Sequence, residues 1–97
     1  MGRSRVPERV RAHVLVSGRV QGVNFRAYAE DEAAFRRVAG WIRNCPDGRV
    51  EAVFEGARPA VEAMLQWCHH GSPAAQVSAV DIAWEPPQGE RTFTVRR

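Results

Sequence analysis

Residues 39–55, Ala-Gly-Trp-Ile-Arg-Asn-Cys-Pro-Asp-Gly-Arg-Val-Glu-Ala-Val-Phe-Glu, carry the clearest structural signal in the chain. Two short strand-like runs, 39–44 and 49–55, flank the four residues Cys45-Pro-Asp-Gly48. Proline presets φ for a turn and glycine accepts a positive φ, so these four residues favour a tight connection. The stretch therefore predicts a β-hairpin in the middle of the chain.

Three further runs show a period of two, which is typical of strands with one buried face. One run, 10–17, precedes the hairpin, and two others lie near 78–85 and 93–95. The positions that share a side are Val10, Ala12, Val14 and Val16, then Ser78, Val80, Ile82 and Trp84, and finally Phe93 and Val95. These runs predict three more strands.

Two helices are expected between these strands. In the first, at about 25–37, Asn24 is the expected N-cap, and Arg36 occupies a position where the helical period requires an apolar residue. In the second, Pro59 suits the first turn and Gly71 can close the C-terminal end. The expected apolar sides are Phe25, Tyr28, Ala29 and Ala33 in the first helix and Val61, Met64, Leu65 and Cys68 in the second.

The element order is strand, helix, strand, strand, helix, strand, followed by a short final strand. This order predicts an α+β fold of the ferredoxin-like βαββαβ type, with two helices on one face of a mainly antiparallel sheet. Right-handed crossover connections leave few other arrangements. A chain of 97 residues has room for one such domain.

All 14 basic residues are arginine, because the sequence contains no lysine. Schiff-base chemistry, a Walker-type phosphate lysine and a desolvated lysine base are therefore excluded. Residues 1–11 hold four arginines and one glutamate, a net charge of +3, whereas 12–97 hold ten arginines and ten acidic residues. We expect 1–11 to be a basic, solvated or disordered leader and 12–97 to be the domain. A neutral domain does not favour a nucleic-acid partner.

No apolar run approaches the roughly 18 residues of a membrane span, and no signal-peptide pattern follows the first arginines. A soluble, cytoplasmic monomer without a membrane partner is expected. Cys45 and Cys68 make no disulfide framework and are expected to be reduced thiols. Cys68, His69 and His70 do not favour a metal site, because neighbouring side chains on a helix point about 100° apart. We expect no metal and no cofactor.

The chemistry concentrates in the loop Ser17-Gly-Arg-Val-Gln-Gly-Val-Asn-Phe-Arg26, between the first strand and the first helix. Glycines 18 and 22 let the backbone turn sharply, and the following helix N-terminus adds partial positive charge. Successive N–H groups can then point at one small anion such as phosphate. Arg26, in the first helical turn, can offer a planar fork to two phosphate oxygens. An ordinary strand-to-helix loop with a surface arginine explains the same residues equally well.

Four segments together resemble the acylphosphatase family, and the resemblance extends from about Val14 to Arg96. The segments are Gly18-Arg-Val-Gln-Gly-Val-Asn-Phe-Arg26, Gly40-Trp-Ile-Arg-Asn44, Asp47-Gly-Arg-Val-Glu51 and Gly71-Ser-Pro73. The family has the ferredoxin-like fold, and its reaction is hydrolysis of a carboxyl-phosphate anhydride to a carboxylate and inorganic phosphate. That reaction uses neither a metal nor a covalent intermediate.

The resemblance also implies roles for individual residues. Arg26 matches the phosphate-binding arginine of the family, and Asn44 matches the asparagine that orients the attacking water. The expected catalytic residues are thus Arg26 and Asn44, with an acyl phosphate as substrate. Together with Arg26, the backbone N–H groups expected to bind the phosphate are those of Arg19, Val20, Gln21, Gly22 and Val23. Gln21 is expected to support the shape of the loop.

The chain departs from the family pattern at the end of the first helix. Arg36 and Arg37 stand where the family usually has Leu-Gly, so this helix end is expected to be reshaped or frayed. Two alternative functions remain open at this point. One is a non-catalytic regulatory domain that binds phosphate or carbamoyl phosphate. The other, binding of single-stranded RNA, is disfavoured because Val50, Ala52 and Phe54 do not resemble the usual aromatic RNA-binding motif.

Overall fold

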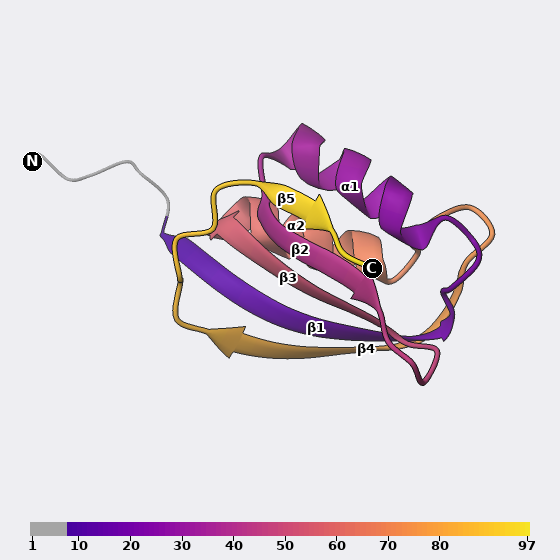
Figure 1. Ribbon diagram of the computed structural model, residues 1–97. Coiled ribbons are helices and arrows are strands. Elements are labelled where there is room, and N and C mark those ends of the chain that lie inside the picture. The colour runs from indigo at the N-terminus through magenta and orange to yellow at the C-terminus, as the bar shows by residue number, and fades with distance from the viewer. Residues whose placement is uncertain (1–7) are drawn as a thin grey trace, which may run out of the picture.

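The computed structural model describes residues 8–97, and these residues form one five-stranded sheet with two helices on one face (Figure 1). In chain order the elements are β1 (Arg9–Arg19), α1 (Phe25–Arg36), β2 (Ala39–Asn44), β3 (Val50–Ala57), α2 (Arg58–Cys68), β4 (Gln76–Glu85) and β5 (Phe93–Val95). The strand order across the sheet is β4-β1-β3-β2-β5. This is the predicted βαββαβ arrangement with a short final strand.

The sheet is mainly antiparallel, as the sequence predicts. β1 pairs antiparallel with β3 and β4, and β2 pairs antiparallel with β3. The exception is β5, which runs parallel to β2 and brings the C-terminal residues beside Ile42. The predicted hairpin between β2 and β3 closes as expected, because the Gly48 N–H donates to the Cys45 carbonyl at 3.1 Å and Gly48 adopts a φ of +97°.

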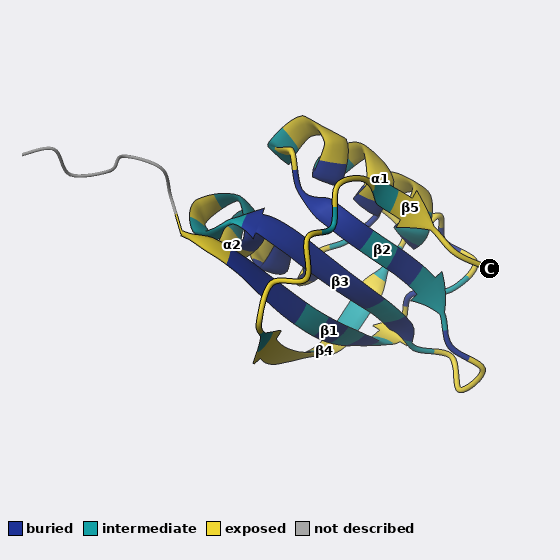
Figure 2. Cartoon of the chain, turned by 60° about the vertical axis from the view of Figure 1, so that its left-hand side comes forward, coloured by how far each residue is buried: buried dark blue, intermediate teal, exposed yellow. Residues whose placement is uncertain are grey.

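The core lies between the sheet and the helices, and buried and partly buried residues alternate along the second half of β1, whereas β3 is buried over most of its length (Figure 2). All four positions predicted to share a side of β1 are buried. The apolar stripe predicted for α2 is also buried in full. The largest fully buried apolar side chains of this core are Phe25, Phe54, Ile42, Met64, Val14, Val16, Val20, Val50 and Val61.

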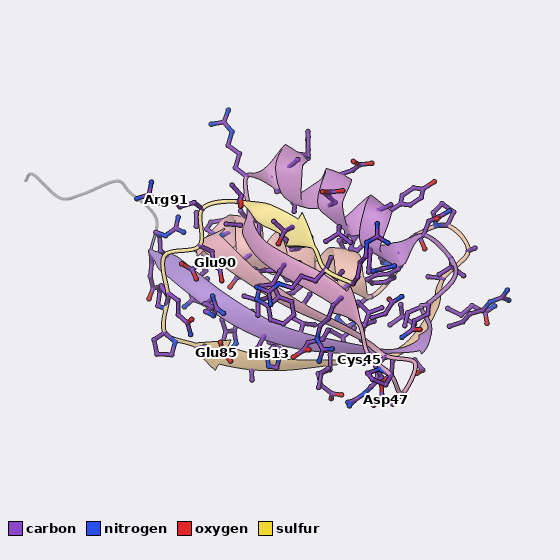
Figure 3. All side chains as sticks on the ribbon, viewed as in Figure 1. His13, Cys45, Asp47, Glu85, Glu90 and Arg91 are labelled. Carbon is purple, nitrogen blue, oxygen red and sulfur yellow. The ribbon has the colours of Figure 1, made fainter. Side chains whose placement is uncertain are left out.

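The opposite face of the sheet carries a group of charged side chains beside the apolar Val53 and Trp41. The Nε2 atom of His13 on β1 lies within hydrogen-bond distance of Glu51 on β3, its Nδ1 atom lies 3.9 Å from Glu85 on β4, and Figure 3 shows His13 and Glu85 along this face. Arg43 of β2 also pairs with Glu51, at 2.6 Å. Since Val50, Ala52 and Phe54 all lie beneath the helices, β3 presents no exposed aromatic ring.

Part of the predicted leader belongs to the sheet. β1 begins at Arg9, and the Arg11 residue is only 6% exposed. Its guanidinium donates to Glu55 at 3.0 Å, to Glu85 at 2.9 Å and to Glu90 at 3.1 Å. Arg9, Val10 and Arg11 are thus paired within the sheet, and three carboxylates surround the Arg11 guanidinium. Residues 1–7, for which a leader is predicted, lie outside the described residues.

Glu55 anchors the connection between β4 and β5. It has no exposed surface, and its two carboxylate oxygens accept the backbone N–H groups of Gln88, Gly89 and Glu90 at 2.7–3.1 Å. Burial alone would raise the pKa of Glu55, but these N–H groups and the Arg11 guanidinium more than offset it and lower that pKa to about 2. The carboxylate thus stays charged and fixes the segment that leads into β5.

Helix α1 differs from its prediction at three positions. Asn24 precedes the helix, but its side chain makes no capping hydrogen bond and its φ is +62°. Tyr28 is 46% exposed, because the buried stripe is the narrow one at Phe25, Ala29 and Ala33. Arg36, expected to disturb the apolar side, instead pairs with Glu32 one turn earlier at 2.6 Å.

The helix end expected to be reshaped or frayed is closed by backbone hydrogen bonds. Arg37 adopts a left-handed φ of +58° and donates to the Ala34 carbonyl at 3.2 Å. The next N–H, that of Val38, donates to Ala33 at 2.9 Å. Arg37 therefore performs in this chain the role that a glycine usually takes after a helix.

Helix α2 ends at Cys68, and the Gly71 N–H donates to the Trp67 carbonyl at 2.8 Å. A side chain at Gly71 would meet the Phe25 ring at 2.4 Å, so glycine is required there by close contact as well as by its φ of +69°. No helix within residues 8–97 is long and apolar enough to cross a membrane.

Candidate active site

The loop between β1 and α1 owes its path to glycines at 18 and 22. Gly18 lies at an irregularity in the pairing of β1 with β4, where a Cβ would come within 2.2 Å of the Gln76 carbonyl oxygen. Gly22 has open space around it but a φ of +74°, which glycine adopts without steric cost. The first glycine thus permits close strand contact, and the second permits the turn of the loop.

The start of α1 is left without a side-chain cap. The Asn24 side chain makes no capping bond, and the first turn contains no acidic residue. Phe25 is 1% exposed and packs edge-on against Trp67 of α2 at 5.1 Å between ring centroids, which fixes the helix start over the core. An uncapped helix N-terminus is a favourable place for an anion.

A cavity of about 280 Å³ opens beside this loop. It brings together Arg26 from the first turn of α1 and Asn44 from the end of β2, two of the residues predicted from sequence. Val20 and Gly22 of the loop line it, whereas Arg19, Gln21 and Val23 do not. The remaining lining residues are Asn24, Phe25, Ala27, Glu30 and Val95.

Arg26 is held by the C-terminal segment. Its Nη1 donates to the backbone carbonyl of Arg96 at 2.9 Å. Arg96 is in turn fixed to β2, because its N–H donates to the Ile42 carbonyl at 2.8 Å and its guanidinium stacks over the Trp41 ring at 4.3 Å. Val95 of β5 therefore lines the cavity, and the carbonyl of the next residue, Arg96, holds Arg26 in place.

Gln21 connects the loop to the β2–β3 hairpin. Its Nε2 donates to the carbonyls of Cys45 at 2.7 Å and Arg49 at 2.9 Å. Both acceptors flank the turn directly after Asn44. The role expected for Gln21, support of the loop shape, fits these two bonds, which link the loop to the strand end that carries Asn44.

The hairpin turn itself is held by a carboxylate. Asp47, at the tip labelled in Figure 3, accepts the Arg49 N–H at 3.1 Å and the Arg49 Nε at 2.9 Å. The hydrogen bonds from Arg49 lower the pKa of the Asp47 carboxyl below its usual range. The turn that follows Asn44 is thus held by hydrogen bonds from both the backbone and the side chain of Arg49.

Neither a metal site nor a disulfide arises in the described part of the chain. Cys68 is fully buried, and burial raises the pKa of its thiol to about 12, while His69 and His70 are exposed. Both cysteines are free thiols. Residues 8–97 contain no group of three or more His, Cys, Asp or Glu side chains that could hold a metal ion.

A larger hollow of about 800 Å³ lies at the other end of β2, between the end of α1 and the β4–β5 connection. It contains none of the catalytic or phosphate-binding residues predicted from sequence. The smaller cavity is the better candidate because residues of the β1–α1 loop, the Arg26 guanidinium and the Asn44 amide meet there.

Sequence reasoning missed Glu30, Val95 and the Arg96 carbonyl as parts of the site. Glu30 could have been found, because it lies four residues after Arg26 and so on the same side of the helix. Val95 and Arg96 gave no local signal. Their place depends on the parallel pairing of β5 with β2, which a three-residue strand does not specify by itself.

The chain is similar to known proteins over nearly its whole length. The family model described as acylphosphatase matches residues 12–95. An acylphosphatase of Natronomonas pharaonis is 59% identical over 90 residues, which cover 93% of this chain and 98% of the relative.

Two solved structures are also similar. The crystal structure of acylphosphatase from Bacillus subtilis superposes with a TM-score of 0.88 at 34% identity and covers 91% of this chain and 99% of that one. A structure of an acylphosphatase from Coxiella burnetii gives a TM-score of 0.87 at 35% identity and covers 91% of this chain and 93% of that one. These matches agree with the fold, and the chain belongs to the acylphosphatase family.

Proposed function

We propose that Arg26 and the backbone N–H groups of residues 19–23 hold the phosphoryl group of the substrate while Asn44 positions the attacking water. The activity of the family is hydrolysis of acyl phosphates, and the chain is a hydrolase of this class. The observation that carries the assignment of roles is that the loop, Arg26 and Asn44 meet at one cavity of about 280 Å³.

An acyl phosphate is already activated, so the site has little covalent chemistry to perform. Water attacks phosphorus, a new P–O bond forms, and the bond between phosphorus and the acyl oxygen breaks. The carboxylate leaves with the electron pair. Holding the phosphoryl group, neutralising its charge and placing one water in line supply the catalysis.

Asn44 suits the water because an amide both donates and accepts hydrogen bonds. An amide is a poor base, so the proton of the attacking water passes to an oxygen of the substrate phosphate. Arg26 suits the phosphate because its guanidinium has five donors and only one is used by the Arg96 carbonyl.

Release of benzoate from benzoyl phosphate by the metal-stripped protein tests this assignment. We expect turnover by the wild type, a large loss of both phosphate affinity and turnover in Arg26→Gln, and preserved phosphate binding in Asn44→Ala. Turnover in Asn44→Ala should fall by about 10²–10³, as after loss of a preorganised polar group. Phosphate binding is measured separately, by the rise in melting temperature with inorganic phosphate.

Arg36→Gln is the matched control, because it removes an arginine from the other end of the same helix and leaves the cavity unchanged. Equal loss of phosphate binding in Arg26→Gln and Asn44→Ala would contradict the separate roles. A folded wild type that binds phosphate but does not turn over would instead support the regulatory-domain alternative. A cytoplasmic location and a monomeric state remain predictions, and size-exclusion chromatography with light scattering tests the second.

A further inference from the structure

Glu30 contributes a negative charge to a site that binds an anion. It lies on α1 four residues after Arg26, and both side chains line the 280 Å³ cavity. Side chains at this spacing are about 5–6 Å apart at their Cβ atoms. Glu30 takes part in no ion pair within residues 8–97, whereas Arg26 is bonded to the Arg96 carbonyl. Glu30 and Arg26 are therefore not joined in an ion pair, although both line the same cavity.

The other walls of the cavity carry no formal charge. Val20, Phe25 and Val95 are apolar, and Asn24 and Asn44 are neutral amides. Arg26, which we place against the phosphoryl group, and Glu30 are thus the charged side chains of the lining. With Arg26 assigned to the phosphoryl group, Glu30 is the remaining charged side chain of the lining that an acyl part can meet.

We propose that Glu30 selects the acyl group by charge and disfavours acyl phosphates whose acyl part carries an anionic group, relative to neutral and cationic ones. This inference rests on the roles proposed for Arg26 and the loop. The phosphoryl group occupies the loop, so the acyl part has to extend along or out of the cavity. Glu30 is exposed, and solvent screening limits the discrimination to about threefold to tenfold per charge.

Glu30 also repels the phosphoryl group of every substrate. That repulsion is common to all acyl phosphates and cancels when two of them are compared on the same enzyme. The selectivity therefore lies in the ratio of kcat/KM values and not in any single value.

The test uses three substrates on one scaffold: benzoyl phosphate, 4-carboxybenzoyl phosphate and 4-(trimethylammonio)benzoyl phosphate. For Glu30→Gln we expect kcat/KM of the carboxylate substrate to rise about threefold to tenfold relative to benzoyl phosphate. The ratio for the trimethylammonium substrate should fall by a similar factor. Glu30→Lys should move both ratios further in the same directions, and 0.5 M NaCl should reduce the differences.

Asp31→Asn is the matched control, because Asp31 is the next residue on the same helix, is exposed and does not line the cavity. It should change both ratios by less than twofold. The proposal is overturned if Glu30→Gln changes kcat/KM equally for the three substrates, or if it changes the ratios no more than Asp31→Asn. Absence of benzoyl phosphate turnover by the folded wild type is a different result, which overturns the proposed roles themselves.

Discussion

Arg26 and Arg96, seventy positions apart in the chain, meet through a hydrogen bond of 2.9 Å from the Arg26 Nη1 to the Arg96 carbonyl oxygen. The acceptor is backbone, so its position depends on β5 and not on the type of side chain at 96. The bond holds one edge of the guanidinium against the C-terminal segment. Its other donors remain for a phosphate.

Arg26→Lys should separate charge from geometry. An ammonium keeps the positive charge but cannot bond to the Arg96 carbonyl and two phosphate oxygens with the planar fork of arginine. We expect kcat/KM for benzoyl phosphate to fall about 10-fold to 100-fold, from the loss of charge-assisted hydrogen bonds worth about 1.5–3 kcal/mol. Steady-state kinetics measure this. A lysine variant as active as the wild type would show that positive charge alone is sufficient.

Gln21→Glu should loosen the loop from the hairpin. The substitution keeps the shape of the side chain but removes the Nε2 donor shared by the Cys45 and Arg49 carbonyls. We expect the free energy of unfolding to fall by about 1–3 kcal/mol and kcat to fall with it, because Asn44 adjoins Cys45. Urea denaturation and benzoyl phosphate kinetics check both effects. Gln66→Glu, on the exposed side of α2, serves as the control. An equal loss of stability and kcat in the two variants would contradict the role of Gln21.

Acid should destabilise the fold through Glu55. Its pKa is about 2 in the folded protein against 4.5 for an ordinary glutamate, so the folded state binds the proton less readily than the unfolded one. The stabilisation is present above about pH 4.5 and is lost as the pH falls toward 2, and it amounts to about 3 kcal/mol at most. Glu51 also contributes to the loss of stability in acid. Burial alone would raise the pKa of Glu51, but the hydrogen bonds from His13 and Arg43 outweigh burial, and the pKa is lowered.

Glu55→Gln isolates this contribution. We expect the variant to be less stable than the wild type at pH 7 and the difference to shrink as the pH approaches 2. Urea denaturation at a series of pH values measures it, with Glu62→Gln on exposed α2 surface as the control. A difference between wild type and variant that stays constant with pH would show that the stability contribution of Glu55 is not electrostatic.

Local patterns predicted most of the fold. The hairpin followed from Pro46 and Gly48, and the second helix from the spacing of its buried side chains, because both signals depend on near neighbours in the chain. Asn24 occupies the N-cap position as predicted, but its side chain makes no capping hydrogen bond. Here the backbone turns through a left-handed conformation at the end of the loop instead.

The features that the sequence did not predict depend on contacts between segments that are distant in the chain. From sequence alone Arg11 belongs to a charged leader, because its partners Glu55, Glu85 and Glu90 are distant from it in the chain. The contribution of Val95 to the site needs the pairing of β5 with β2. Arg26 and Asn44, by contrast, were predicted because the family motifs name them, and their convergence on one cavity fits that assignment.

Arg37→Gly should stabilise the protein. Arg37 holds a φ of +58° after α1, a conformation that costs an L-residue roughly 1 kcal/mol and glycine little. The Arg37 N–H bond to Ala34 and the Val38 N–H bond to Ala33 are backbone bonds and survive the change. We expect the free energy of unfolding to rise by about 0.5–1 kcal/mol, measured by urea denaturation. Arg37→Ala removes the same side chain without relieving the backbone, so it should give no gain, and equal stabilisation by alanine and glycine would place the effect in the side chain.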